Sequence, residues 1–142
     1  MARSNGQLSH GILLLDSEGL SKAVNADPQV TAFIKAAQAK DLLVAVSDLT
    51  LIEAWHARIP MARFRWYVSR LEVLAVSEAL TWSAIDLLRN ANLHGHKYAT
   101  DAVVAATALS YHGPRIILTS DVDDMVKLCG DRAHIEGVRG ET

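Results

Sequence analysis

Short apolar runs alternate with segments of helical periodicity along this 142-residue chain. Runs of four or more apolar residues between polar ones are typical of strands that are buried on both faces of a sheet. Five segments fit this description in whole or in part, the last being the weakest: residues 11–15, 42–46, 71–76, 115–118 and 134–138. The alternation of strands and helices predicts one α/β domain with a central parallel sheet of four to five strands flanked by helices.

Capping residues and helix breakers mark where the helices begin and end. Asp27 followed by Pro28 provides an N-cap and a proline at the first helical position. Ser47 or Asp48 can cap a second helix, which Pro60 interrupts. Helices are expected over residues 28–39, 48–59, 60–70, 78–92, 98–112 and 121–130. The chain shows no internal repeat and no linker, so we expect an N-terminal tail (1–10), one domain (11–138) and a C-terminal tail (139–142).

Composition and charge limit the possible functions. Half of the residues are apolar and 21% are charged, which is typical of a well-packed globular protein. The net charge of −2 excludes a protein that coats nucleic acid by bulk electrostatics, so such binding requires local basic patches. Cys129 is the only cysteine, so the chain forms no internal disulfide and the thiol is expected to be buried. No segment reads as a signal peptide or a membrane span, and these features predict a cytoplasmic protein.

Four acidic residues lie where the predicted strands end or where the next helix begins. Asp16 directly follows the first strand, and Asp121 closely follows the fourth. Glu53 lies in the second turn of the helix that begins after the second strand. The helix that carries Asp101 is joined to the fourth strand by the tight turn 113–114, so its N-terminus lies at the carboxyl end of that strand. Parallel strands place their carboxyl ends at one edge, where open α/β sheets bind ligands. We therefore expect the four carboxylates to converge.

Converging carboxylates repel one another, and a hard divalent cation with oxygen ligands relieves that repulsion. Mg²⁺ or Mn²⁺ fits such a set of ligands best. A metal of this kind lowers the pKa of a bound water, and a pair of metals stabilises both the attacking and the leaving oxygen of a phosphodiester. The predicted chemistry is therefore metal-dependent cleavage of a nucleic acid without a protein nucleophile.

The segments that carry these acids occur in a characteristic order. They read Leu-Leu-Asp-Ser at 14–17, Leu-Thr-Leu-Ile-Glu-Ala-Trp at 49–55, Ala-Thr-Asp-Ala-Val-Val-Ala-Ala-Thr-Ala-Leu at 99–109 and Ile-Leu-Thr-Ser-Asp-Val-Asp-Asp at 117–124. Together they resemble the PIN-domain nucleases, and among these the VapC-type toxins of bacterial type II toxin–antitoxin systems. The resemblance extends from about residue 12 to residue 129. Its last two segments are the most specific.

The resemblance implies a Mg²⁺- or Mn²⁺-dependent endoribonuclease, with RNA as substrate, an antitoxin protein as partner and a homodimer as the assembly. The residues that match the family's metal-binding and catalytic acids are Asp16, Glu53, Asp101 and Asp121. Asp124 is a further candidate ligand, and Asp123 is an accessory acid. Thr119 matches the family's hydroxyl residue before the last acid. Ser17 stands where many relatives have threonine, and both side chains are small hydroxyls.

Basic and aromatic residues surround Pro60. Four arginines (58, 63, 65 and 70) are interleaved with Trp55, Trp66 and Tyr67. Such a pattern can hold phosphates and stack bases, and Arg63 and Arg65 are the candidate substrate-binding residues. The alternative is a solvated pair of helices whose aromatic side chains lie in the core or under a partner. The histidines at 94 and 96, in a polar segment, are left out of the predicted metal site.

Each acid also has an ordinary structural interpretation. Asp16 and Asp121 can simply end strands, and Asp101 is at a position that the helix dipole favours. Glu53 shares a helical face with Leu49 and Ile52, and full exposure is therefore not expected.

Other functions remain open at this point. They are a housekeeping PIN-domain nuclease for RNA processing, a non-catalytic RNA-binding module, and a receiver-like Mg²⁺-binding module. The receiver pattern has adjacent acids after the first strand and a lysine after a late strand, and this chain lacks both. The presence of all four acids argues against a non-catalytic module.

Overall fold

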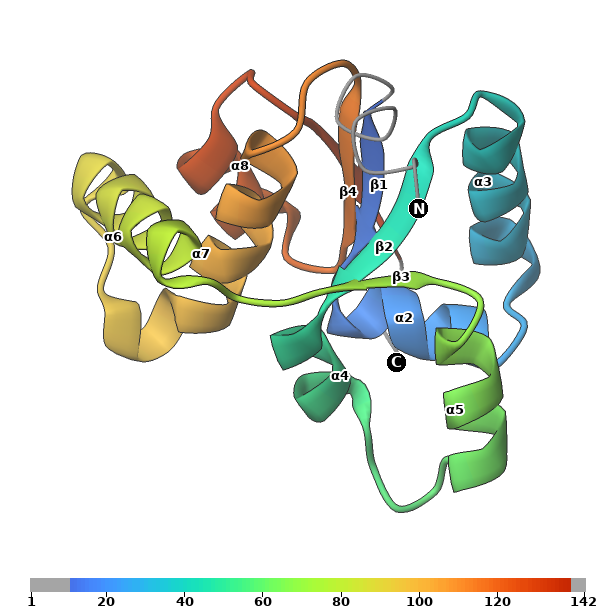
Figure 1. Cartoon of the computed structure of the whole chain (residues 1–142). Helices are drawn as coiled ribbons and strands as arrows, with labels where there is room; N and C mark the ends of the chain where they lie inside the picture. The colour runs from blue at the N-terminus through green and yellow to red at the C-terminus, as the bar shows by residue number, and fades with distance from the viewer. Residues whose placement is uncertain (1–10, 139–142) are drawn as a thin grey trace.

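The computed structural model describes residues 11–138, and the expected tails at 1–10 and 139–142 lie outside the described residues. Strands and helices alternate along the described part of the chain (Figure 1). They are β1 (Ile12–Leu15), α2 (Ser17–Val24), α3 (Pro28–Ala39), β2 (Leu43–Ser47), α4 (Asp48–Ala54), α5 (Met61–Val68), β3 (Glu72–Leu74), α6 (Glu78–Ala91), α7 (Gly95–Leu109), β4 (Arg115–Thr119), α8 (Val122–Cys129) and β5 (His134–Gly137).

The five strands form one parallel sheet in the order β3-β2-β1-β4-β5. The apolar side chains of β1 are fully buried because this strand is at the centre of the sheet, with helices on both faces. The predicted α/β fold with a central parallel sheet is therefore confirmed.

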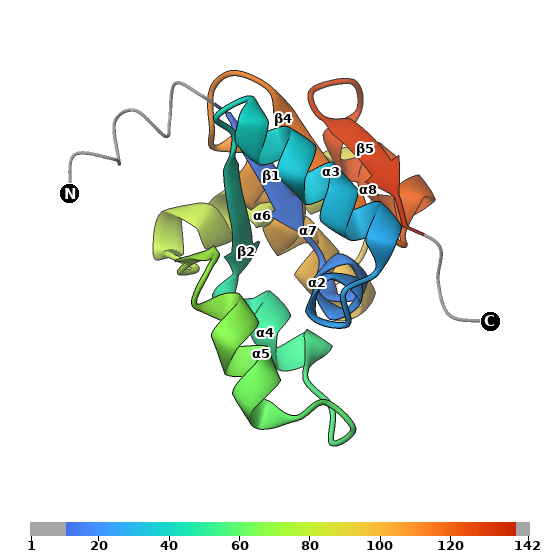
Figure 2. The same ribbon diagram turned by 90° about the vertical axis from the view of Figure 1, so that its right-hand side faces the viewer.

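Two layers of helices enclose the sheet (Figures 1 and 2). Helices α2, α3, α4 and α5 contribute to one hydrophobic core, and α6, α7 and α8 contribute to the other. The chain moves outward from β1 through β2 to β3 and then returns to β4 on the other side of β1. Right-handed crossovers place the connecting helices on opposite faces before and after such a reversal. The reversal lies between β1 and β4, and the carboxyl ends of the strands at such a point are the usual position of a ligand site.

Pairing across the sheet brings three chain segments together at this edge. Leu15, the last residue of β1, pairs with Val46 of β2 and with Leu118 of β4. Asp16 therefore follows the central strand, between Ser47 on one side and Thr119 on the other.

Three helices differ from the prediction. Helix α4 ends at Ala54, five residues before the predicted end at residue 59. The sequence indicated no helix between Asp16 and Asp27, but α2 occupies most of that interval, and Asp16 is its N-cap. Helix α7 begins at Gly95 rather than near Tyr98, although Tyr98 itself has non-helical backbone angles (φ −113°, ψ 17°). Regular helix thus begins after the kink at Tyr98, close to the predicted start.

The remaining structural predictions concern Cys129 and the membrane. Cys129 is fully buried, as expected, and burial raises the pKa of its thiol to about 11, so the thiol stays protonated at neutral pH. Within residues 11–138, no helix is both long enough and apolar enough to cross a bilayer.

Candidate metal centre

Asp16 is the most rigidly held of the acidic residues. Its side chain is only 5% exposed, and its carboxylate accepts hydrogen bonds from the backbone N–H groups of Gly19 (2.8 Å) and Ser120 (3.2 Å). The hydroxyl of Thr119 also hydrogen-bonds to this carboxylate. Burial raises the pKa of Asp16, whereas these hydrogen bonds favour the ionised form and lower it. Asp16 therefore links α2 to the end of β4 at a fixed position.

Asp101 lies at the centre of the acidic group. Its carboxyl is partly buried in the first turn after the kink in α7. Burial is the largest cause that raises its pKa, from 3.8 to about 7, and the negative charges of four other carboxylates raise it further. These carboxylates are, in decreasing order of effect, Asp121, Asp124, Glu53 and Asp16. The structure thus brings together the predicted acids from four different segments of the chain.

The segment after β4 supplies the hydroxyl and two of these acids. Thr119 is fully buried, and its hydroxyl oxygen accepts a hydrogen bond from the backbone N–H of Asp121 (2.9 Å). Asp121 precedes α8, but its side chain does not cap that helix, so its carboxylate is free to turn toward Asp101. Asp124, in the first turn of α8, raises the pKa of Asp101. Asp123 lies in the same turn but is exposed, and it is not among the residues that shift the pKa of Asp101. The geometry therefore favours Asp124 over Asp123 as a participant.

Glu53 is more exposed than the sequence indicated. It lies in the second turn of α4, as predicted, but its side chain is exposed, and the neighbouring Ile52 is 76% exposed. The expectation that Glu53 is not fully exposed was wrong, because the face that it shares with Leu49 and Ile52 is not the buried face of α4. Only Thr50 and Ala54 are buried in this helix.

The cluster suits a hard cation because all of its groups are carboxylates. The side chains have to rotate before they can bind such a cation. Within residues 11–138, no three His, Cys, Asp or Glu side chains lie close enough together to hold a metal ion without rearrangement. Repulsion between like charges explains why the carboxylates stay apart. Glu53 and Asp121 are exposed and can change rotamer at little cost, whereas Asp16 is already fixed. An all-oxygen set of this kind fits Mg²⁺ or Mn²⁺.

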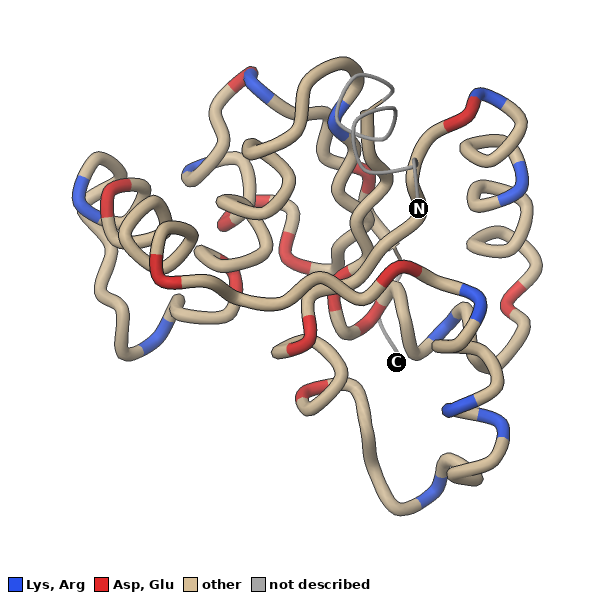
Figure 3. Tube along the Cα trace, in the orientation of Figure 1, with Lys and Arg blue, Asp and Glu red and all other residues tan. Residues whose placement is uncertain are grey.

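Acidic and basic residues occupy different parts of the molecule (Figure 3). Acidic segments gather where the strand ends meet α2, α4 and the start of α7, near the centre of the view. Basic segments lie mainly at the periphery, including the side formed by α2, α5 and the loop before α5. The acidic cluster is therefore local in a protein with a net charge of only −2.

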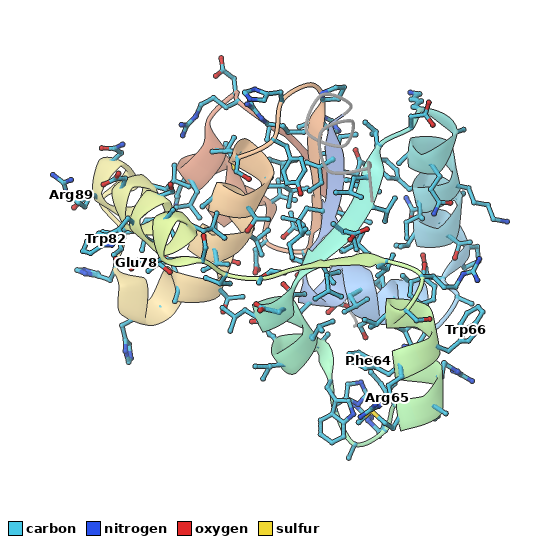
Figure 4. All side chains as sticks on the ribbon, in the orientation of Figure 1. Phe64, Arg65, Trp66, Glu78, Trp82 and Arg89 are labelled. Carbon is cyan, nitrogen blue, oxygen red and sulfur yellow. The ribbon has the colours of Figure 1, made fainter. Side chains whose placement is uncertain are left out.

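The candidate substrate-binding arginines lie away from the acids, on α5. Arg63 and Arg65 are exposed, and neither acts on the pKa of Asp101. Phe64 between them is buried in the core, while Trp66 projects from the opposite side of the helix and is 59% exposed (Figure 4). Arg70 lies over the ring of Trp66, with its guanidinium carbon 5.1 Å from the ring centroid. This helix therefore presents basic and aromatic groups to solvent.

The pKa of Asp101 predicts a pH-dependent stability of the metal-free protein. Because the folded-state pKa is raised, the folded protein retains a proton that the unfolded chain releases between about pH 4 and pH 7. Stability is therefore present at low pH and is lost as the pH rises through 7. After a discount for partial exposure, we expect a loss of ~1 kcal/mol between pH 5 and pH 8. Urea unfolding in EDTA at the two pH values measures it.

Asp101→Asn is the control for this measurement, because asparagine resembles the protonated acid and does not ionise. The variant should match the wild type at pH 5 and be more stable than the wild type at pH 8. Equal changes with pH in both proteins would show that Asp101 does not titrate in this range.

Comparisons with known proteins support the fold independently of the site. No family model matches this sequence, and no curated protein sequence matches it. A chain in the crystal structure of VapBC2 from Rickettsia felis, bound to a DNA fragment from their promoter, superposes with a TM-score of 0.68 at 18% identity. The match covers 90% of this chain and 99% of that chain. A chain in the structure of FitAB bound to the IR36 DNA fragment gives a TM-score of 0.65 at 17% identity, over 92% of this chain and 100% of that chain. The protein thus has the fold of these VapBC2 and FitAB chains over nearly its whole described length.

Proposed function

We propose that this protein is a Mg²⁺- or Mn²⁺-dependent endoribonuclease, a hydrolase of RNA phosphodiester bonds. The observation that carries the proposal is the group of carboxylates around Asp101 of α7, which come from the residue after β1, from α4, and from the segment after β4 and the start of α8. Uncompensated carboxylates at a partly buried position are costly to the fold, which suggests that they serve a ligand. The likeness in fold to chains of the VapBC2 and FitAB structures supports this proposal.

Each residue has a distinct part in this proposal. Asp16 provides a preset carboxylate, held by two backbone N–H groups. Asp101 and Asp121 provide two further carboxylates for the metal, and Glu53 provides another from α4. Asp124 adds negative charge from the first turn of α8.

Metal binding requires Asp101 to lose its proton. A bound Mg²⁺ or Mn²⁺ supplies an activated water and neutralises charge on the phosphate. Because the pKa of Asp101 is about 7, affinity for metal should rise with pH through neutrality. The Thr119 hydroxyl, which bonds to Asp16 and accepts from Asp121 N–H, fixes the relative positions of these two residues.

We propose further that the enzyme is the toxin of a toxin–antitoxin pair. Support comes from the likeness to chains of the VapBC2 and FitAB structures, and from an exposed apolar surface beside the site. This surface consists of Ile52 in α4 and Trp55 at its end, which are 76% and 44% exposed. A partner helix with an apolar face suits such a surface. An antitoxin bound to this surface would lie next to Glu53. The proposed assembly of the enzyme itself is a homodimer.

Cleavage of a panel of structured RNAs tests the enzymatic proposal directly. Wild-type protein with Mn²⁺ should cut at discrete positions, and EDTA should abolish cutting. Asp101→Asn, purified identically, controls for contaminating nucleases. Activity that persists in the Asp101→Asn preparation would assign the cleavage to a contaminant and refute the proposal.

Metal should also stabilise the folded protein, because a ligand that binds only the native state shifts the unfolding equilibrium. At a metal concentration about 100 times the Kd, the gain is about 2.7 kcal/mol. For a domain of this size, that corresponds to a rise in Tm of roughly 5–10 °C. Thermal unfolding at pH 8 in EDTA and in Mn²⁺ measures the shift.

The matched variant for the thermal experiment is Asp101→Asn, which should be more stable than the wild type in EDTA but gain little from Mn²⁺. Identical melting curves for the wild type in EDTA and in millimolar Mn²⁺ would argue strongly against a metal site.

A further inference from the structure

A groove adjoins the acidic cluster between α2 and the loop that joins α4 to α5. Its volume of about 770 Å³ falls in the range of ~300–1,000 Å³ that is usual for clefts holding small organic ligands. Glu53 is part of its lining, so the groove is continuous with the proposed metal site. This groove was not predicted, because no helix was expected where α2 lies.

One wall of the groove is a polar face of α2. Ser17, Ser21 and Asn25 line it at intervals of four residues, which places them on one side of the helix. Lys22 also lines the groove and is only partly exposed. Within residues 11–138 the ammonium group of Lys22 makes neither an ion pair nor a hydrogen bond. A partly buried lysine with no such partner is available to an anionic ligand.

The other wall is the loop after α4, where Arg58 lines the groove. This part of the loop is held in place. The backbone N–H of Arg58 donates to Nδ1 of His56 (3.2 Å), and Ile59 is 4% exposed and belongs to the hydrophobic core. The guanidinium of Arg58, like the ammonium of Lys22, makes no ion pair within the described residues.

The acids in the lining leave these two cations unpaired. The carboxylate of Asp27 accepts a hydrogen bond from the backbone N–H of Val30 (3.0 Å) as the cap of α3. Glu53 belongs to the acidic cluster, and Glu18 is in the first turn of α2, where the helix dipole stabilises it. Hydroxyl, amide and cationic groups beside a cluster of carboxylates suit a phosphodiester chain whose reacting phosphate is at the carboxylates.

We infer that this groove binds a single-stranded segment of RNA next to the scissile phosphate, with Lys22 and Arg58 as its phosphate contacts. This inference rests on the proposed nuclease function and identifies the path of its substrate. Arg63 and Arg65 do not line the groove, so they are not the phosphate contacts in this assignment.

A protein segment fits this groove less well than RNA. Partner helices dock through apolar faces, whereas most of the side chains that line this groove are polar or charged. The exposed apolar side chains Ile52 and Trp55 do not line it. The groove and the apolar surface are therefore assigned to different ligands.

The test measures RNA binding without cleavage. A fluorescently labelled, single-stranded RNA of ten nucleotides and mixed sequence is titrated with Asp101→Asn protein in EDTA, at several salt concentrations. Each phosphate contact contributes a slope of about −0.7 to log K against log[salt] for single strands. Lys22→Ala and Arg58→Ala, each introduced separately into the Asp101→Asn protein, should make this slope shallower by ~0.7. Each substitution should weaken binding to RNAs of different sequence to the same extent.

Lys127→Ala is the charge-matched control, because Lys127 is exposed on α8 and does not line the groove. It should leave the slope unchanged. Lys22→Gln should repeat the effect of Lys22→Ala with less loss of volume, and thermal unfolding should show that all variants are folded. A duplex of the same length should bind more weakly than the single strand.

Unchanged slopes for Lys22→Ala and Arg58→Ala, an equal change for Lys127→Ala, or a duplex that binds as well as the single strand would each overturn the inference. Unchanged slopes would leave the groove as a site for a protein segment. Failure here is distinct from failure of the proposed function. The latter would appear as absence of Mn²⁺-dependent cleavage and of Mn²⁺-induced stabilisation in the wild type, and neither measurement involves the groove variants.

Discussion

Asp101→Asn is expected to reduce Mn²⁺-dependent RNA cleavage by at least ~100-fold, the scale on which loss of one charge-stabilising group lowers catalytic rates. Asp101 is surrounded by the charges of four other carboxylates, so its loss removes the central member of the cluster. The fold should survive, because the substitution removes a partly buried charge and retains the shape of the side chain. Cleavage rates at saturating Mn²⁺, with unfolding curves for the same preparations, measure both effects.

Glu53→Gln and Asp121→Asn should have similar effects on cleavage and little effect on stability, since both side chains are exposed. Asp16→Asn differs from them. An asparagine at this position directs an N–H group at a backbone N–H that Asp16 now accepts from, either at Gly19 or at Ser120. A buried donor without an acceptor costs about 1–3 kcal/mol. Asp16→Asn should therefore lose activity and stability together.

The adjacent acids of α8 provide a matched pair of controls. Asp124 acts on the pKa of Asp101 and Asp123 does not, although both carry the same charge in the same helical turn. Asp124→Asn should slow cleavage, and Asp123→Asn should leave it near the wild-type rate. If two or more of the variants at 16, 53, 101 and 121 cleave like the wild type at saturating metal, the idea of a shared site fails.

The strands were predictable because both faces of this sheet are covered. Burial on both faces requires nearly continuous apolar runs, and such runs are visible without knowledge of the fold. The strand ends then located Asp16 and Asp121, and the turn at 113–114 set the direction of α7. The convergence of the acids thus followed from the topology of a parallel sheet.

Helix α2 was missed for an identifiable reason. It is only eight residues long and contains Gly19, a residue that disfavours helix. The glycine is explained by tertiary structure, because a Cβ at this position would lie 3.1 Å from the carbonyl oxygen of Leu118. Close packing of α2 on β4 therefore overrides local propensity. The groove that depends on α2 was consequently invisible in the sequence, as was the end of α4 before His56.

Burial of Asp16 also restricts how a partner protein can inhibit the site. Both carboxylate oxygens of Asp16 already accept backbone hydrogen bonds, and the side chain is almost inaccessible. An arginine from an antitoxin is therefore expected to pair with Asp101, Asp121 or Glu53, through charge-assisted hydrogen bonds, in place of the cation. The exposed apolar side chains Ile52 and Trp55 would hold the rest of that partner beside Glu53.

Expression of the wild-type chain alone in a bacterium is expected to arrest growth, because an RNA-cleaving enzyme without its inhibitor acts on cellular RNA. Asp101→Asn should restore growth at the same level of expressed protein, since it removes cleavage and leaves the fold intact. Trp66→Ala, which changes an exposed side chain on α5 away from the acids, should remain as toxic as the wild type. Colony counts after induction, with the amount of soluble protein measured in parallel, test all three expectations. Normal growth with abundant, soluble wild-type protein that cleaves RNA in vitro would contradict the toxin proposal. It would favour a housekeeping nuclease, whose activity the cell tolerates because the substrates are restricted.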